Sequence, residues 1–450
     1  MHVNQAMGGL RIDGKTYWLS NVDGASYDNV AQQYVPRTNV IFTTARLYAN
    51  GNNILVEQYD FSPRGITYPT DLGGNPNKGI YLKRYLITNN GPTTKTGQFY
   101  FYGDFALNGG DAFDVMDHDL ARGAMYAKDT TYRNAGDVGE YNPTSFPGYV
   151  KDVSLYLAAA MKLAPAPGAA GGTPAAASWR QVSSDNDQGW IGLEITLPPG
   201  VTREVDVAIV GGFDAFPNAT GTYAWQIAPV IDWFIAQNVS QLQAATEAYW
   251  QAWLDAGTTV NFPDPTYNEL FERGLLATAL HQDEKNGGIV AGMHNGAYPF
   301  VWPRDAAWAA ITLARTGHVD NATEAMRFLR DVAYRDNESW GRKGWWKQKY
   351  TTDGYQVWTA PQIDETSCYP WAAKFIYDVT GDTAWLADHY DEIWEAAVVS
   401  VLEYSPVVFE DGISKRKSAV DGRLFYNVTL DLVHSNNLWE DQFGPFNYSV

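Results

Sequence analysis

Apolar residues follow two different periodicities along the chain, and the change comes near residue 240. In the first part, apolar and polar residues alternate, which places every second side chain on one face of a β-strand. The clearest runs are Ile191, Leu193, Ile195, Leu197 and Val205, Val207, Ile209. The segment Pro198-Pro199-Gly200 separates these runs and predicts a pair of half-buried strands around a turn.

Further strands are predicted at about 54–61, 80–88 and 98–105, separated by turn clusters such as Asn89-Asn90-Gly91-Pro92. Many short strands without helices between them indicate a large antiparallel β-sandwich. Segment 164–177 consists mainly of Ala, Pro and Gly. Such a composition predicts a flexible surface loop between strands of the sandwich, not a domain boundary.

Helical periodicity begins after residue 238. Ser240 is a suitable N-cap, Gly257 a suitable end, and one helical face carries Leu242, Ala245, Tyr249 and Trp253. Further helices are predicted at about 266–282, 303–316, 321–335, 364–379 and 382–404. Asn321 and Glu324 suggest a capping box, and Asp382 an N-cap. We therefore expect a sandwich domain over 1–238, a linker helix over 239–262 and a helical domain over 263–450.

Composition narrows the classes of partner. The 450 residues carry a formal charge of −19, which argues against binding to a nucleic-acid backbone or an anionic membrane surface. No apolar run is long enough to cross a bilayer, and nothing after Met1 resembles a signal peptide. The 17 Trp and 28 Tyr exceed the usual needs of a core and suit a surface that meets sugar rings. The long aromatic loop at 336–362 is a candidate wall for such a site.

Several other chemistries lack support in the sequence. The chain shows no phosphate-binding glycine loop, and its seven His lack the spacing of metal ligands. We therefore expect no cofactor, and no motif indicates a structural calcium site. The single Cys368 lies within a predicted helix and is interpreted as an inert core thiol.

One segment concentrates candidate chemistry at the start of a helix. A helix is predicted to begin at Pro303 and to end at Gly317. Its start brings together Trp302, Arg304 and Asp305. Trp offers a flat apolar face to a sugar ring, and Arg and Asp supply donors and acceptors for its hydroxyls. The local chemistry alone fits a buried Arg304–Asp305 ion pair beside a core Trp equally well.

Three segments in order resemble motifs of the glucoamylase family of inverting glycosidases, glycoside hydrolase family 15. They are Trp302-Pro303-Arg304-Asp305, Ala360-Pro361-Gln362-Ile363-Asp364-Glu365-Thr366 and Asn437-Leu438-Trp439-Glu440-Asp441. The resemblance implies an antiparallel supersandwich followed by an (α/α)6 toroid whose loops form the active site. It also implies an exo-acting, inverting hydrolase that releases glucose from α-glucans or α-glucosides.

The resemblance assigns roles to individual residues. Glu440 matches the family's general acid, while Trp302, Arg304, Asp305, Gln362, Asp364, Glu365, Trp439 and Asp441 would bind the sugar. An acid between Trp439 and Asp441 can keep its proton near neutral pH, as a general acid must. Alternatively, Asp364 and Glu365 are ordinary acidic residues in the first turn of a helix, where they stabilise its N-terminus. Asp441 stands where the fungal enzymes have a second Glu, and its side chain is one methylene shorter.

The pattern yields fewer helices than the twelve of a full toroid, so we expect an incomplete ring. By resemblance, the other half supplies the general base, and no residue here is assigned that role. Either the chain is a fragment, or a second polypeptide or a second copy of the chain covers the open face. The chain alone is expected to be inactive.

The alternative function is a non-catalytic, carbohydrate-binding or assembly-forming protein of the same architecture. Sequons occur at Asn218, Asn238, Asn321, Asn337, Asn427 and Asn447. They favour a glycosylated extracellular protein, with Asn321 as a poor acceptor because it is expected to cap a helix.

Overall fold

The chain divides into two units in a computed structural model. One unit comprises residues 1–133 and 152–253, and the other comprises 134–151 and 254–450. The structure describes residues 5–19, 26–66, 78–105, 107, 115–132, 153–165, 171–173, 176–180, 188–213, 227–293, 299–333, 344, 346–358, 363–398, 408–410, 413–415, 424–427, 432–435 and 446–448.

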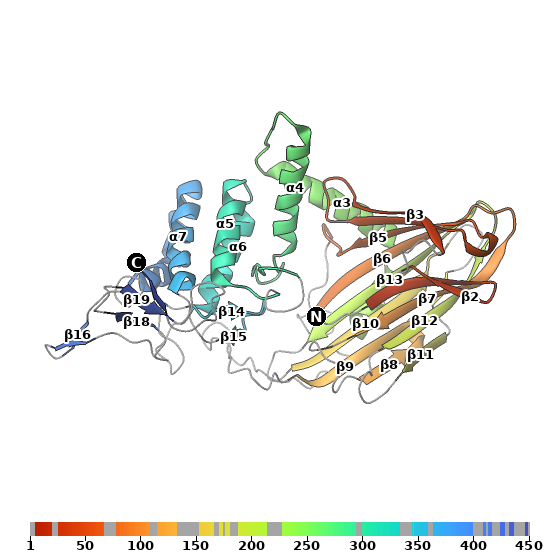
Figure 1. Cartoon of the computed structure of the whole chain (residues 1–450), viewed down its shortest axis with the longest axis horizontal. Coiled ribbons are helices and arrows are strands. Elements are labelled where there is room, and N and C mark those ends of the chain that lie inside the picture. Colours follow the sequence, from red (N-terminus) through yellow and green to blue (C-terminus); the bar gives the residue numbers. More distant parts are fainter. Residues whose placement is uncertain are drawn as a thin grey trace. The chain divides into compact units, whose positions relative to one another are not determined.

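The first unit contains two antiparallel sheets (Figure 1). The order of the larger sheet is β3 (Tyr27–Tyr34), β4 (Ile41–Leu47), β5 (Ile54–Phe61), β6 (Lys78–Asn89), β13 (Thr202–Phe213), β10 (Val153–Leu163), β9 (Ala124–Tyr132), β8 (Val115–Asp119). The order of the smaller sheet is β11 (Ala176–Arg180), β12 (Gln188–Leu197), β7 (Lys95–Asp104), β1 (Gln5–Ile12), β2 (Lys15–Trp18).

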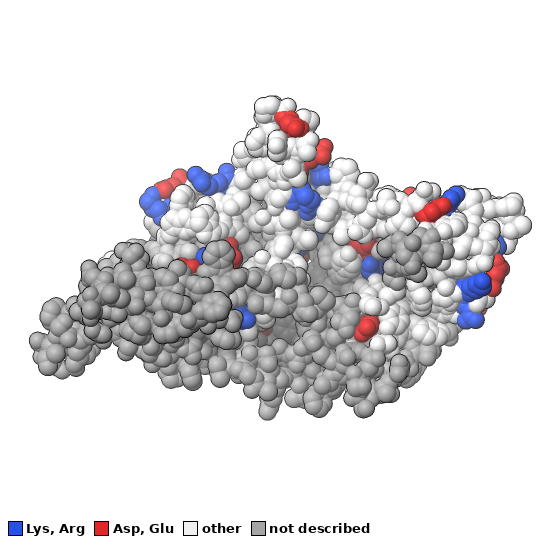
Figure 2. All heavy atoms as spheres, in the orientation of Figure 1, with Lys and Arg blue, Asp and Glu red and all other residues white. Residues whose placement is uncertain are grey.

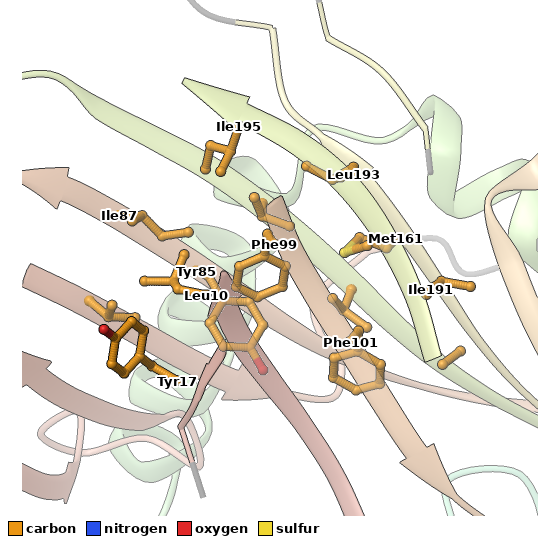
Figure 3. Close-up of a cluster of buried hydrophobic side chains, with 14 of the residues drawn as sticks. Leu10, Tyr17, Tyr85, Ile87, Phe99, Phe101, Met161, Ile191, Leu193 and Ile195 are labelled. Carbon is orange, nitrogen blue, oxygen red and sulfur yellow. The ribbon is translucent and has the colours of Figure 1, made fainter. Parts of the chain in front are cut away.

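Side chains from both sheets form the main core of this unit (Figure 3). Phe99 and Phe101 of the smaller sheet are fully buried, as is Tyr85 of the larger sheet. The rings of Tyr85 and Phe99 lie 4.9 Å apart, which joins the two sheets through an aromatic pair. This is the core of a β-sandwich, in which the inward residues of each strand alternate with outward ones.

Strand positions follow the alternating pattern closely, but one predicted pairing is wrong. The runs at 54–61, 80–88 and 98–105 correspond to β5, β6 and most of β7. β12 and β13 are not partners in a hairpin, because β12 pairs with β7 and β11 whereas β13 pairs with β6 and β10. The segment Pro198-Pro199-Gly200 thus carries the chain from one sheet to the other. Alternation reports which side chains are buried, but it does not report which strand supplies the hydrogen bonds.

Two helices cover the outer face of the larger sheet. Phe234 of α2 (Ala228–Ala236) and Leu242 of α3 (Val239–Ala256) pack in a second buried cluster with Ala158, Ala160, Ala208 and Val210 of the sheet. The predicted N-cap at Ser240 is wrong by two residues, since the Asn238 side chain accepts the hydrogen bond from the Gln241 amide at 3.1 Å. Asn238, within one of the sequons, therefore contributes to the start of α3.

The second unit is mainly helical (Figure 1). Its helices are α4 (Pro265–Leu280), α5 (Pro303–Arg315), α6 (Val319–Val332), α7 (Ile363–Thr380), α8 (Thr383–Asp388) and α9 (Tyr390–Val398). α5 packs against both α6 and α7, and α7 also packs against α9. The strands described in this unit form only small sheets: β14 (Lys349–Tyr350) with β15 (Gln356–Trp358), β16 (Val408–Glu410) with β17 (Ile413–Lys415), and β18 (Leu424–Asn427) with β19 (Leu432–Ser435) and β20 (Phe446–Tyr448).

Helix ends test the capping predictions. α5 begins at Pro303 with Asp305 in its first turn, Gly317 follows the helix with φ +89°, and the Asp382 side chain caps α8. The predicted helix over 382–404 is divided, because α8 ends at Asp388 and α9 begins at Tyr390. Asn321 is not a cap. It lies in the first turn of α6, and its side chain donates to Gln282 Oε1 at 2.7 Å.

The sequons at Asn218 and Asn337 and the side chains of Asn427 and Asn447 lie outside the described part.

The described part of the aromatic loop after α6 contributes to the core, while its expected use as a sugar-site wall stays a prediction. Trp346 is fully buried, stacks on Tyr369 at 4.6 Å between ring centroids, and donates from Nε1 to the Leu329 carbonyl at 2.8 Å. Tyr350 and Tyr355 are buried as well. Trp340, Trp345 and the side chain of Trp358 lie outside the described residues.

Surface charge and hydropathy add two observations. On the face drawn in Figure 2, acidic and basic side chains of the described residues are interspersed. None of the helices that the structure describes is both long enough and apolar enough to span a bilayer.

Candidate active site

Two of the three motifs meet at the N-termini of neighbouring helices. Arg304 lies in the first turn of α5, and Asp364 and Glu365 lie in the first turn of α7. The backbone amide of Arg304 donates to Glu365 Oε2 at 2.6 Å. Arg304 Nη1 donates to Asp364 Oδ2 at 2.7 Å. Packing between α5 and α7 thus connects residues about 60 positions apart into one charged cluster.

Three carboxylates surround the single guanidinium. Besides Asp364, Arg304 lies 3.5 Å from Asp305 and 3.6 Å from Glu365 Oε1. The side chains differ in exposure: Glu365 is fully buried, Arg304 is 16% exposed, Asp364 24% and Asp305 44%. Such an ion pair is one interpretation the sequence allowed, but the closest partner of Arg304 is Asp364 and not Asp305. A buried, doubly bonded arginine holds both helix ends in fixed geometry.

Burial raises the pKa of the Glu365 carboxyl well above its ordinary value. The carboxylates of Asp364 and Asp305 act in the same direction, while Arg304 opposes the shift. Water is excluded from this side chain, and the charged form is therefore costly. Shifted carboxyl groups of this kind are frequent at functional sites.

Two carboxylate oxygens of the cluster have spare hydrogen-bonding capacity. Asp364 Oδ1 and Glu365 Oε1 are buried and have no hydrogen-bond partner among the described residues. Buried polar atoms in native proteins are almost always satisfied, so an unused acceptor indicates an absent partner. Hydroxyl groups of a sugar are suitable donors for such oxygens.

Trp302 lies beside the cluster at the N-cap of α5 and is half-buried. The strand segment at Val301 pairs with Tyr350 through hydrogen bonds of 2.8 and 2.9 Å, which brings Lys349 to the same place. Lys349 Nζ lies 5.7 Å from the centroid of the Trp302 ring and 4.7 Å from that of Phe300. The sequence analysis did not identify Lys349, although its position in the aromatic loop between Trp346 and Tyr350 was a possible signal.

The remaining candidates divide into two sets. Gln362, Trp439, Glu440 and Asp441 lie outside the described residues. Cys368 lies within α7, one turn after Asp364, and burial raises the pKa of its thiol to about 12. A thiol that stays protonated is a poor nucleophile, as expected for an inert cysteine. Within the described ranges, no group of three or more His, Cys, Asp or Glu could hold a metal ion.

Comparisons with known proteins give a match in fold. No protein family profile matches the chain, and no curated protein matches it in sequence. A solved structure described as "Putative kojibiose phosphorylase from human microbiome" matches with a TM-score of 0.60 and 9% sequence identity. The match covers 95% of this chain and 51% of that one, so the chain spans about half the length of the protein it matches.

This likeness confirms the predicted fold class. The chain has an antiparallel β-sandwich followed by part of an α/α toroid. The match extends over nearly the whole chain, so it includes both the sandwich and the helical region. The narrower resemblance to glycoside hydrolase family 15 stays a prediction from the three motifs.

Proposed function

We propose that the chain belongs to an enzyme that cleaves α-glucosidic bonds with inversion, and that its innermost sugar site includes Trp302, Arg304, Asp305, Asp364 and Glu365. The observation that carries the proposal is the meeting of two separate motifs around Arg304, with Asp364 bonded at 2.7 Å and Glu365 at 2.6 Å. Unused carboxylate oxygens at the same place support it. The likeness in fold to a protein described as a kojibiose phosphorylase is consistent with a carbohydrate substrate.

Each side chain has a distinct task in this site. Sugar hydroxyls donate to Asp364 Oδ1 and Asp305, while Arg304 holds Asp364 so that its orientation is set before the sugar binds. The apolar face of the sugar ring packs on Trp302, whose other neighbour is the Lys349 ammonium. Glu365 Oε2 accepts a hydrogen bond from the backbone amide of Arg304 and so positions that residue. This oxygen is therefore not used to bind the sugar.

Glu440 is the proposed general acid. It donates its proton to the glycosidic oxygen as the bond to the anomeric carbon breaks, and a nucleophile attacks that carbon from the opposite face. In hydrolysis the nucleophile is water, which loses a proton to a general base that we assign to no residue here. The product is then β-glucose.

Phosphorolysis is a second candidate, favoured by the matched solved structure. Inorganic phosphate would attack the anomeric carbon in place of water and yield β-glucose 1-phosphate. Phosphate is already anionic, so this route needs no general base, while the leaving oxygen still needs the proton of Glu440. The two routes therefore share the acid and differ in the nucleophile.

Glu440→Gln should lower turnover of maltose or kojibiose by ~10²–10⁴, because the amide keeps the shape and removes the proton. Substrates with good leaving groups, such as α-glucosyl fluoride, should lose much less. Proton NMR of the first product, with and without inorganic phosphate, separates β-glucose from β-glucose 1-phosphate. The control is Glu269→Gln at an exposed position of α4, which should leave turnover unchanged.

Equal losses for natural and fluoride substrates would argue against Glu440 as the acid. The assay includes the chain alone and the chain with a polypeptide that completes the helical ring. Sugar binding without either product in both samples would instead support the non-catalytic alternative.

A further inference from the structure

An open pocket of about 690 Å³ lies in the sandwich unit and shares no lining residue with the Arg304 cluster. Its floor is the outer face of the larger sheet, where β10 contributes Lys162 and β13 contributes Glu204 and Asp206. One wall is the junction between α2 and α3 at 235–240, and another is made by 163–165 and 171–173. This volume is in the range of small-ligand sites. The Ala, Pro and Gly segment thus contributes its described parts to a pocket.

Charged residues form a row across three neighbouring strands at the pocket floor. Lys162 of β10 stands opposite Asp206 of β13, and Asp206 stands opposite Arg84 of β6. Directly opposed residues share one face of a sheet. Ordinarily Asp206 would pair with one of these cations, but both direct their donors elsewhere.

Lys162 Nζ and the two Nη atoms of Arg84 donate to the helices and to Glu204, while Arg84 Nε has no hydrogen-bond partner among the described residues. Lys162 Nζ donates to the carbonyls of Phe234, Ile235 and Gln237, which lie at the C-terminal end of α2 and its C-cap. Arg84 donates to Glu204 at 2.7 Å and to Gln243 at 3.0 Å. The positive charges therefore fix α2 and α3 on the sheet and leave Asp206 between them.

Asp206 has an unused oxygen in the pocket. The residue is 1% exposed, and its Oδ1 has no hydrogen-bond partner among the described residues. Burial raises the pKa of Asp206 to about 8, and the neighbouring Glu204 carboxylate adds to the rise while Lys162 and Arg84 oppose it. An unsatisfied buried acid is costly, and a bound partner would remove the cost.

The chemistry of the pocket favours a neutral ligand rich in hydroxyl groups. Lys162 donates to three backbone carbonyls and Arg84 donates to Glu204, so groups of the chain itself occupy these cations and no bound anion is needed. Thr173, Gln237, Asn238 and Ser240 line the pocket and offer both donors and acceptors. Leu163, Pro165 and Val239 supply an apolar surface for the carbon face of a ring. We propose that this pocket is a second carbohydrate site, of one or two sugar units, in which a hydroxyl donates to Asp206 Oδ1.

The test uses the full chain labelled with ¹³C at alanine methyls, because Ala164 and Ala236 line the pocket. Titration with maltose to about 10 mM, enough to populate a site of millimolar Kd, should shift both methyl signals. Gly172→Trp should abolish the shifts by filling the pocket, whereas Gly172→Ala should keep them, since an added Cβ there meets nothing within 4 Å. The methyl signals of Ala164 and Ala236 report on this pocket and not on the proposed catalytic site. If the proposed function is wrong, these two signals should still shift with maltose.

Asp206→Asn provides the specific arm. A donated hydroxyl stabilises the ionised carboxylate, so wild-type affinity should increase as pH rises toward 8 and above, and maltose binding should release protons. The variant should bind about tenfold more weakly above that pH and without pH dependence. The absence of maltose shifts at Ala164 and Ala236 in the wild type would overturn the proposal. Shifts with putrescine or inorganic phosphate but not maltose would also overturn it, in favour of an ion site.

Discussion

Arg304→Met is expected to lower the free energy of unfolding by about 3 kcal/mol, because it leaves the Asp364 and Glu365 carboxyl groups without their buried cation. Glu365 has no exposed surface on which to recover solvation. The loss should be greater near neutral pH than at a pH below the ordinary range of carboxyl groups, where Glu365, whose pKa is raised by burial, carries a proton in both the folded and the unfolded chain. Urea unfolding followed by tryptophan fluorescence at both pH values measures this difference.

Arg327→Met is the matched control, since Arg327 lies exposed on α6 of the same unit. Its effect should stay within about 0.5 kcal/mol. A similarly small effect of Arg304→Met would mean that the guanidinium does not balance these carboxylates, and the proposed preorganised site would lose its basis. The double variant Arg304→Met with Asp364→Asn should recover part of the lost free energy of unfolding, because the second substitution replaces an unpaired carboxyl group by a neutral amide.

Asp206→Asn is expected to stabilise the sandwich unit increasingly as pH rises. The folded-state pKa of Asp206 is about 8, against an ordinary value of 3.8, so the folded chain retains a proton that the unfolded chain has released. Wild-type stability therefore falls as pH rises between these two values, and the asparagine variant lacks that fall. A shift of this size corresponds to a maximum difference on the order of 5 kcal/mol between variant and wild type. Chemical unfolding of both proteins at several pH values measures it.

Asp13→Asn serves as the control for this experiment. Asp13 is an exposed aspartate of the same unit, with a side chain 62% exposed and φ +53°, a conformation that asparagine also adopts readily. Its free energy of unfolding should stay within about 1 kcal/mol of wild type, because the ion pair of Asp13 with Lys95 is exposed. A difference between Asp206→Asn and wild type that does not change with pH would show that the Asp206 carboxylate is stabilised when charged, contrary to the unpartnered geometry at the pocket floor.

The position and type of many elements could be predicted from the sequence. Alternating residues such as Ile54 to Phe61 form β5 because a strand needs one buried face, and that requirement appears directly as a period of two. Pro303 marks a helix start because its fixed φ suits the first helical position, and Asp382 marks one because its side chain accepts hydrogen bonds from amides two and three residues later. Motif order also indicated that Arg304, Asp364 and Glu365 belong together, and the structure places them in contact.

Contacts between distant residues were decided only by the tertiary structure. The alternation in β12 and β13 did not show that they belong to different sheets, because a strand's own pattern is the same whichever neighbour pairs with it. Trp346 was expected in a loop that forms the wall of a sugar site, and it is buried on Tyr369, since burial depends on what packs above a side chain. Asp206 was one polar position in a strand. Its position between Lys162 and Arg84, its burial and its raised pKa arise from three strands and two helices that meet only in the folded chain.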